Sequence, residues 1–139
     1  MDCTGNNLFE HAIKRYQLGN SPSELLDDFI KITNQTPQHS AGWTCLAWLQ
    51  LLENQREEAL TSARTAVRLN PQDPQAHVNL CLALLENNAK GVREHIEIVK
   101  QIITIAPNLA KELKESLKDG LYRKPNWKSL KKVKKWLDL

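Results

Sequence analysis

The stretch that decides the fold is residues 40–73, SAGWTCLAWLQLLENQREEALTSARTAVRLNPQD. Apolar residues in its first half recur at the spacing of one face of an α-helix: Trp43, Leu46, Ala47 and Leu51. The polar segment ENQRE separates them from a second series of this kind: Ala59, Ala63, Ala66 and Val67. Pro71 then ends the unit, because proline lacks a backbone N–H and restrains the residue before it. The stretch therefore predicts two α-helices joined by a short turn.

The same plan recurs on both sides of this stretch. Three prolines, Pro37, Pro71 and Pro107, each follow an amphipathic run and lie 34 and 36 residues apart. Two helix starts are also marked, by SPSE at residues 21–24 and by DP at residues 73–74. The sequence has no alternating pattern typical of strands. We therefore predict an all-α chain with helices at about 6–18, 22–35, 40–53, 56–69, 74–87, 91–105, 108–119 and 126–137.

This pattern resembles that of the tetratricopeptide repeat (TPR) family, in its small bacterial type, whose unit is a helix–turn–helix of about 34 residues. Residues 40–73 carry the resemblance best, with large residues, small residues and a closing proline where the family has them: Trp43, Leu46, Ala47, Ala59, Ala66 and Pro71. Gln50 and Asn54 depart from the pattern, which has an aromatic residue and a glycine at these points. The units that begin at Asn6 and Pro74 match more loosely.

The resemblance implies a fold and a class of function. The fold is a right-handed solenoid of helical hairpins in a single domain over residues 1–139. Its repeats lie at about 6–39, 40–73 and 74–107, and a basic C-terminal capping segment follows at 108–139. One unit cannot bury its apolar face alone, so about three are needed for a stable stack. The implied function is non-enzymatic binding of another protein, as an adaptor, assembly factor or regulator.

In this family the first helices of successive units line a concave groove that binds the partner. Carried over to this chain, the resemblance predicts a largely apolar groove formed by Thr44, Trp48, Leu51, Leu52, Gln75, Val78, Leu82 and Leu85. Such a groove suits a partner helix or an extended peptide, because aromatic anchors dominate interface energetics. In the alternative interpretation, the C-terminal helices fold back and fill this groove as ordinary core.

Some members of the family hold acidic C-terminal tails with a clamp of Lys, Asn and Arg side chains. The corresponding positions of this chain hold other residues: Glu10, Lys14, Cys45, Gln75 and Asn79. The clamp is therefore absent, and we do not expect an acidic tail to bind in that manner.

The C-terminal segment is the second predicted surface. Residues 111–139 contain ten Lys or Arg against four acids, a net charge of +6, whereas residues 1–110 carry −3. Seven of these ten form the predicted basic surface: Arg123, Lys124, Lys128, Lys131, Lys132, Lys134 and Lys135. A basic amphipathic helix with tryptophans can contact nucleic-acid phosphates, an anionic membrane surface or an acidic protein. In the alternative interpretation it caps the solenoid, with its apolar face on the last repeat and its lysines in water.

Composition excludes several other classes of protein. The 41% apolar fraction and the net charge of +3 argue against general disorder, and no apolar run is long enough for a membrane span. Three widely spaced cysteines (Cys3, Cys45 and Cys81) and no secretory signal favour reduced thiols in the cytoplasm. The glycines are isolated, and the four histidines lie in different elements with no Cys or His at the spacing of metal ligands. We therefore expect no catalytic site, no cofactor and no metal.

Overall fold

In the computed structural model, which describes residues 4–139, the chain folds into eight α-helices, and this part of it contains no β-strand. The helices are α1 (Thr4–Gln17), α2 (Pro22–Gln35), α3 (Ser40–Leu52), α4 (Arg56–Leu69), α5 (Pro74–Glu86), α6 (Val92–Ile105), α7 (Pro107–Arg123) and α8 (Lys128–Trp136). The predicted all-α class is therefore confirmed. Cys3 lies outside the described residues.

Local signals in the sequence account for several of the helix ends. The Glu24 carboxylate accepts a hydrogen bond from the backbone N–H of Ser21 at 3.0 Å, and Asp73 accepts one from the N–H of Gln75 at 3.0 Å. Asn54, where the family has a glycine, takes the left-handed conformation with a φ of 61°. Asparagine tolerates this conformation better than most residues, so the turn between α3 and α4 keeps its shape.

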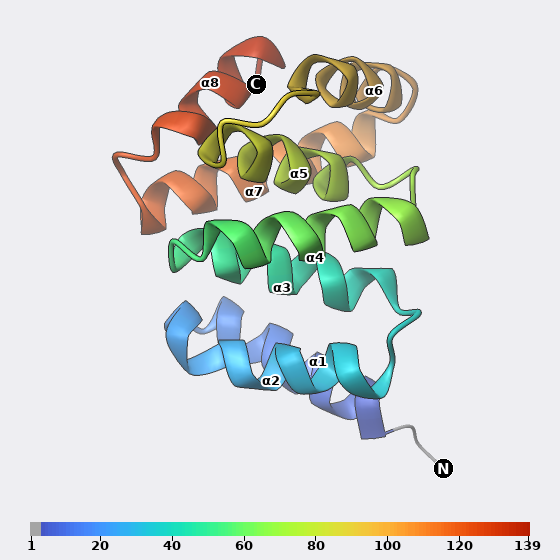
Figure 1. The fold of residues 1–139 in the computed structure, drawn as a ribbon, viewed down its shortest axis with the longest axis vertical. Helices are drawn as coiled ribbons and strands as arrows, with labels where there is room; N and C mark the ends of the chain where they lie inside the picture. The colour runs from blue at the N-terminus through green and yellow to red at the C-terminus, as the bar shows by residue number, and fades with distance from the viewer. Residues whose placement is uncertain (1–3) are drawn as a thin grey trace.

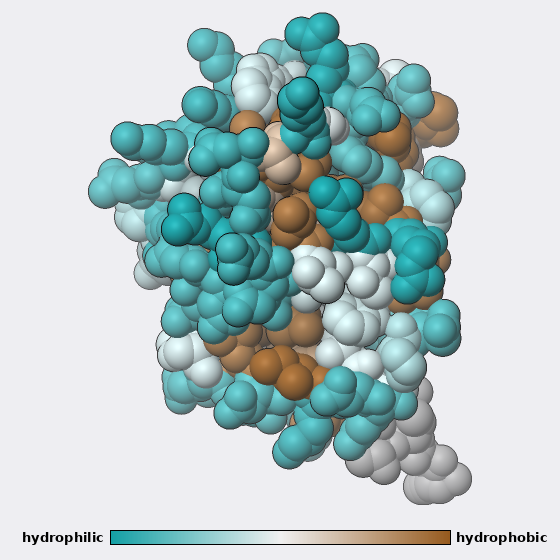
Figure 2. All heavy atoms as spheres, in the orientation of Figure 1, coloured by the Kyte–Doolittle hydropathy of each residue, from teal (hydrophilic) through white to brown (hydrophobic). Residues whose placement is uncertain are grey.

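Three helical hairpins, α1–α2, α3–α4 and α5–α6, stack along the long axis of the molecule (Figure 1). Helices α3 and α4 pack on each other, and the small residues Ala47, Ala59, Ala63 and Ala66 are all fully buried, as close packing of helices requires. None of the helices in residues 4–139 is long and apolar enough to span a membrane. Hydrophilic residues cover most of the face seen in Figure 2, and apolar residues appear there only in separate groups.

The largest cluster of core residues lies between the hairpins and the C-terminal helices. It joins residues of α3 and α5, such as Leu51 and Leu82, to Leu117 of α7 and Leu130 of α8. A smaller cluster around Phe29 holds the first hairpin against α3. The C-terminal helices therefore belong to the core of the protein and do not merely close its end.

Helix α7 is longer than the sequence predicts. The sequence predicts that this helix spans about residues 108–119. The observed helix continues through Gly120 to Arg123. The reason is tertiary packing, since residues of α3 and α8 surround Gly120 at close range.

Candidate functional site

The structure places most of the predicted groove residues beneath α7 and α8. Trp48, Leu51, Leu52, Val78 and Leu82 are each at most 9% exposed and share one core cluster with side chains of α7 and α8. Leu85 is partly buried and packs against the same cluster. Of the two interpretations left open by the sequence, the structure thus shows the one in which the C-terminal helices fill this part of the groove.

Gly120 allows α7 to lie directly on Trp48. A Cβ atom at this position would come within 2.8 Å of the Trp48 ring and 2.9 Å of a Leu130 methyl group. The Trp48 ring also packs against that of Trp127, with 5.3 Å between the ring centroids. Sequence reasoning treated Gly120 only as an isolated glycine and missed this contact. The one available signal was a glycine inside an otherwise amphipathic helix.

A polar network around Tyr16 joins α7 to α1 and α3. The indole N–H of Trp48 donates a hydrogen bond to the Tyr16 hydroxyl at 2.9 Å, and that hydroxyl donates to the Asp119 carboxylate. The Arg123 guanidinium donates to Asp119 at 3.1 Å and lies 3.7 Å from the centroid of the Tyr16 ring. Burial and the hydrogen bond to Asp119 raise the pKa of Tyr16 above its usual value of 10.0.

Lys124 fixes the link between α7 and α8. Its Nζ donates to the backbone carbonyl of Leu51 at 3.1 Å and to Oδ1 of Asn54 at 2.7 Å, and it lies 4.9 Å from the Trp127 ring centroid. Arg123 and Lys124 were both predicted to belong to the basic surface. Both instead bind within the protein, where they hold the C-terminal helices in place.

The rest of the concave surface stays open between α1, α3 and α7, as a cavity of about 560 Å³. We call it the open groove. Its floor is mainly apolar and consists of Ile13, Tyr16, Phe29, Cys45, Trp48 and Leu49. Acidic residues of α7 form one wall: Glu112, Glu115 and Asp119. Three of the eight predicted groove residues line it as well, namely Thr44, Trp48 and Gln75.

Polar contacts hold the predicted residues Thr44 and Gln75 in place. The Gln75 amide donates to Oδ1 of Asn79 at 2.8 Å, and the Asn79 amide donates to the Thr44 carbonyl at 2.9 Å. The second of these bonds joins α5 to α3 at the edge of the open groove, and the first holds the Asn79 side chain within α5. Asn79 is fully buried, so its satisfied amide fixes how the two helices pack.

The open groove carries unneutralised negative charge. Glu112 and Glu115 are exposed and form no ion pair within residues 4–139. Burial raises the pKa of Asp73, and the nearby charge of Glu112 adds to the effect. Burial, helped by Asp73, raises the pKa of the Cys45 thiol to about 12. Cys45 is therefore protonated at neutral pH and is a poor nucleophile.

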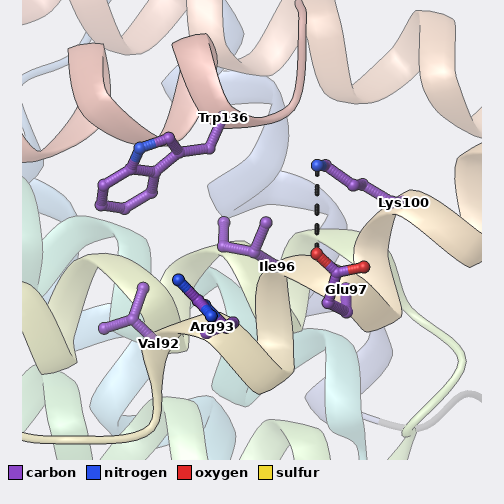
Figure 3. Close-up of a pocket in the computed structure, with 6 residues that line it drawn as sticks. All are labelled: Val92, Arg93, Ile96, Glu97, Lys100 and Trp136. Atoms are coloured by element: carbon purple, nitrogen blue, oxygen red, sulfur yellow. Dashed lines mark ion pairs between the residues drawn. The ribbon is translucent and has the colours of Figure 1, made fainter.

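A second cavity, of about 680 Å³, lies between α6 and α8. Figure 3 shows its lining residues, which are Val92, Arg93, Ile96, Glu97, Lys100 and Trp136. Four lysines of the neighbouring basic helix are exposed: Lys128, Lys131, Lys132 and Lys135, while Lys134 is partly buried. The sequence predicted the basic residues of α8 but not this cavity, because no local pattern indicates that Trp136 at the end of α8 lies across from α6.

Two histidines predicted to lie in separate helices meet between α5 and α6. Nδ1 of His77 is 2.9 Å from Nδ1 of His95, and Nε2 of His77 is 2.7 Å from the Pro71 carbonyl oxygen. Both contacts are satisfied when His77 carries its proton on Nε2 and accepts a hydrogen bond from His95. Burial, and next the proximity of His77, lower the pKa of His95. Within residues 4–139, no group of three or more metal-ligating side chains could hold a metal ion.

Comparison with known proteins identifies the fold. No family model matches the chain, and no curated protein matches it. Among solved structures, it is similar to the first TPR domain of Spaghetti (RPAP3) bound to the HSP90 peptide SRMEEVD, with a TM-score of 0.56 and 18% sequence identity. The match covers 97% of this chain and 94% of the other. The chain therefore has the all-helical repeat fold of a TPR domain, as its sequence predicted.

Proposed function

We propose that this chain is a non-enzymatic protein-interaction module that binds a segment of a partner protein in the open groove, as an adaptor, assembly factor or regulator. The observation that carries the proposal is a cavity with an apolar floor and an acidic wall on the concave face of a TPR fold. The similar TPR domain of Spaghetti was solved with a peptide bound, which supports a peptide-sized ligand. The free thiols of Cys45 and Cys81 support a cytoplasmic location.

The chemistry of the open groove defines the partner segment. Its floor suits one or two apolar side chains, and Glu112 and Glu115 suit a Lys or Arg beside them. The one basic residue of the lining, Arg123, already binds Asp119. We therefore expect a segment with apolar and basic residues, and not an acidic tail like the SRMEEVD peptide of the similar structure.

The other predicted groove residues serve this function indirectly. Leu51, Leu52, Val78, Leu82 and Leu85 form or adjoin the apolar seat on which α7 and α8 pack. This seat holds α7 at the edge of the open groove. The acidic wall of the proposed binding site therefore depends on them.

A peptide library displayed on phage tests the proposal. Selection against the wild-type protein should enrich sequences with an apolar residue next to Lys or Arg. A Glu112→Arg/Glu115→Arg variant should bind these peptides at least about tenfold more weakly, which corresponds to about 1.4 kcal/mol. An Asp27→Arg/Glu57→Arg variant, with the same charge change on α2 and α4, should bind them normally. Enriched peptides that bind both variants equally well would contradict the site.

The sequence also predicts an alternative function, binding of nucleic acid or of an anionic membrane surface through α8. The exposed lysines Lys128, Lys131, Lys132 and Lys135 support it. It ranks second because Leu130 and Val133, the apolar face of α8, are fully buried and cannot insert into a membrane. Binding to RNA or acidic vesicles that weakens steeply with salt would favour this alternative.

A further inference from the structure

The cavity between α6 and α8 has the features of a second docking site. Two aliphatic side chains of α6, Val92 and Ile96, face the indole ring of Trp136 from α8 across it (Figure 3). Trp136 is 41% exposed, whereas Trp127, the residue just before the same helix, is 2% exposed. A cavity of about 680 Å³ with apolar walls can accept a bulky apolar side chain.

The rim of this cavity is basic. Arg93 and Lys100 of α6 line it, and Lys132 precedes Trp136 by about one turn on the same side of α8. Glu97 is the only acidic side chain of the lining, and its carboxylate lies 4.0 Å from the Lys100 ammonium group. Within residues 4–139, Arg93 and Lys132 form no ion pair. Their charges are therefore available to a ligand.

We infer that the cavity between α6 and α8 docks an acidic segment of a partner protein that carries one bulky apolar side chain. The apolar side chain fills the space between Ile96 and Trp136, and flanking Asp or Glu residues face Arg93, Lys100 and Lys132. This site goes beyond the proposed function, because it shares no lining residue with the open groove and its charge has the opposite sign.

The shape of the cavity favours a protein segment over other anionic ligands. A nucleic-acid base between Val92 and Ile96 would lose the hydrogen bonds of its edges to water without gaining new ones. A membrane surface binds apolar side chains that project from the protein. Here Ile96 is only 5% exposed and lines the cavity together with the charged side chains of Arg93 and Lys100, which suits a single projecting side chain of a partner.

A labelled peptide tests the inference by fluorescence anisotropy. The probe is an octapeptide with one phenylalanine flanked on both sides by glutamates. Trp136→Ala should weaken its binding at least tenfold, because the anchor loses one wall of its pocket. Arg93→Glu should weaken it by a similar factor and remove much of its salt dependence. Lys31→Glu, the same charge change as Arg93→Glu on an exposed position of α2, should leave it unchanged.

Further controls separate this site from the other surfaces. A peptide with alanine in place of phenylalanine should bind at least tenfold more weakly, and Glu112→Arg/Glu115→Arg should leave the binding of the octapeptide intact. Circular dichroism verifies that each variant is folded. The inference is overturned if wild-type protein does not bind the octapeptide, or if folded Trp136→Ala binds it equally well. It is also overturned if single-stranded oligonucleotides or anionic vesicles bind more tightly than the octapeptide.

Discussion

Tyr16 shows how much of this structure depends on one side chain. Its ring packs against the Arg123 guanidinium, and its hydroxyl both accepts a hydrogen bond from Trp48 and donates one to Asp119. The sequence places Tyr16 on the apolar face of the first helix but gives no sign of these partners. Asp119 and Arg123 lie more than one hundred residues further along the chain, so no local pattern connects them to Tyr16.

Tyr16→Phe should change how stability depends on pH. Because the folded protein raises the pKa of Tyr16 above 10.0, the protonated phenol stabilises the fold at pH values below about 10. This contribution is lost as the pH rises further toward the pKa that Tyr16 has in the folded protein. The variant should therefore lose less stability than the wild type between pH 9 and pH 11, as measured by urea unfolding. At neutral pH it should be less stable by about 1 kcal/mol, because the Trp48 N–H loses its acceptor.

Tyr122→Phe is the matched control for this experiment. Tyr122 is 84% exposed, so its loss should leave both the stability and its pH dependence close to those of the wild type. An alkaline profile of Tyr16→Phe that coincides with the wild-type profile would contradict the assigned role of the phenol.

At the scale of the element, α7 shows which features a sequence can predict. Its amphipathic pattern predicts a helix, because that pattern is local. Its extension through Gly120 and its position on Trp48 result from packing between residues about seventy positions apart, which no local pattern reports. The residues of the open groove likewise include some that the sequence predicts and others that it does not. Family positions on α3 and α5 predict Thr44 and Gln75, but the acidic wall on α7 follows only from the three-dimensional structure.

The two tryptophans of the α8 segment should differ strongly in their effect on stability. Trp127→Ala should lower the free energy of unfolding by about 3–5 kcal/mol, because it removes a buried ring that packs on Trp48 and donates a hydrogen bond to Glu86. Trp136→Ala should lower it by less than about 1 kcal/mol, because its ring is partly exposed. Urea unfolding of the two variants measures the difference. Similar losses in both would contradict the placement of α8.

At the scale of the whole molecule, the protein departs from a simple solenoid. In a solenoid each repeat contacts only its neighbours, so the two ends unfold with considerable independence. Here α7 reaches back to the first helix through Tyr16, Asp119 and Arg123. The stacking of hairpins is predictable from the period of the sequence. This contact between the two ends is not, because it depends on the angle at which α7 crosses the stack.

Hydrogen exchange in the native state should reveal this coupling. Arg123→Ala removes contacts to Tyr16 and Asp119, so amide exchange in α1 and α7 should increase by about tenfold, corresponding to a loss of about 1.4 kcal/mol. Exchange in α4 should stay at the wild-type rate. Arg68→Ala, on the exposed face of α4, is the control and should not accelerate exchange in α1. Equal rates in α1 of the two variants would argue against the coupling.

Helices α7 and α8 cover the apolar surface around Leu82 and Val78, so a ligand for this surface has to compete with them. Any molecule that binds around Leu82 and Val78 does so only in the fraction of molecules whose C-terminal helices have detached. Its apparent dissociation constant is then the intrinsic one divided by that fraction. If detachment requires about 4 kcal/mol, an intrinsically nanomolar ligand is measured as micromolar. A ligand for that part of the concave face therefore needs a much higher intrinsic affinity in order to bind. A ligand of the open groove does not, because it binds without detachment of α7 and α8.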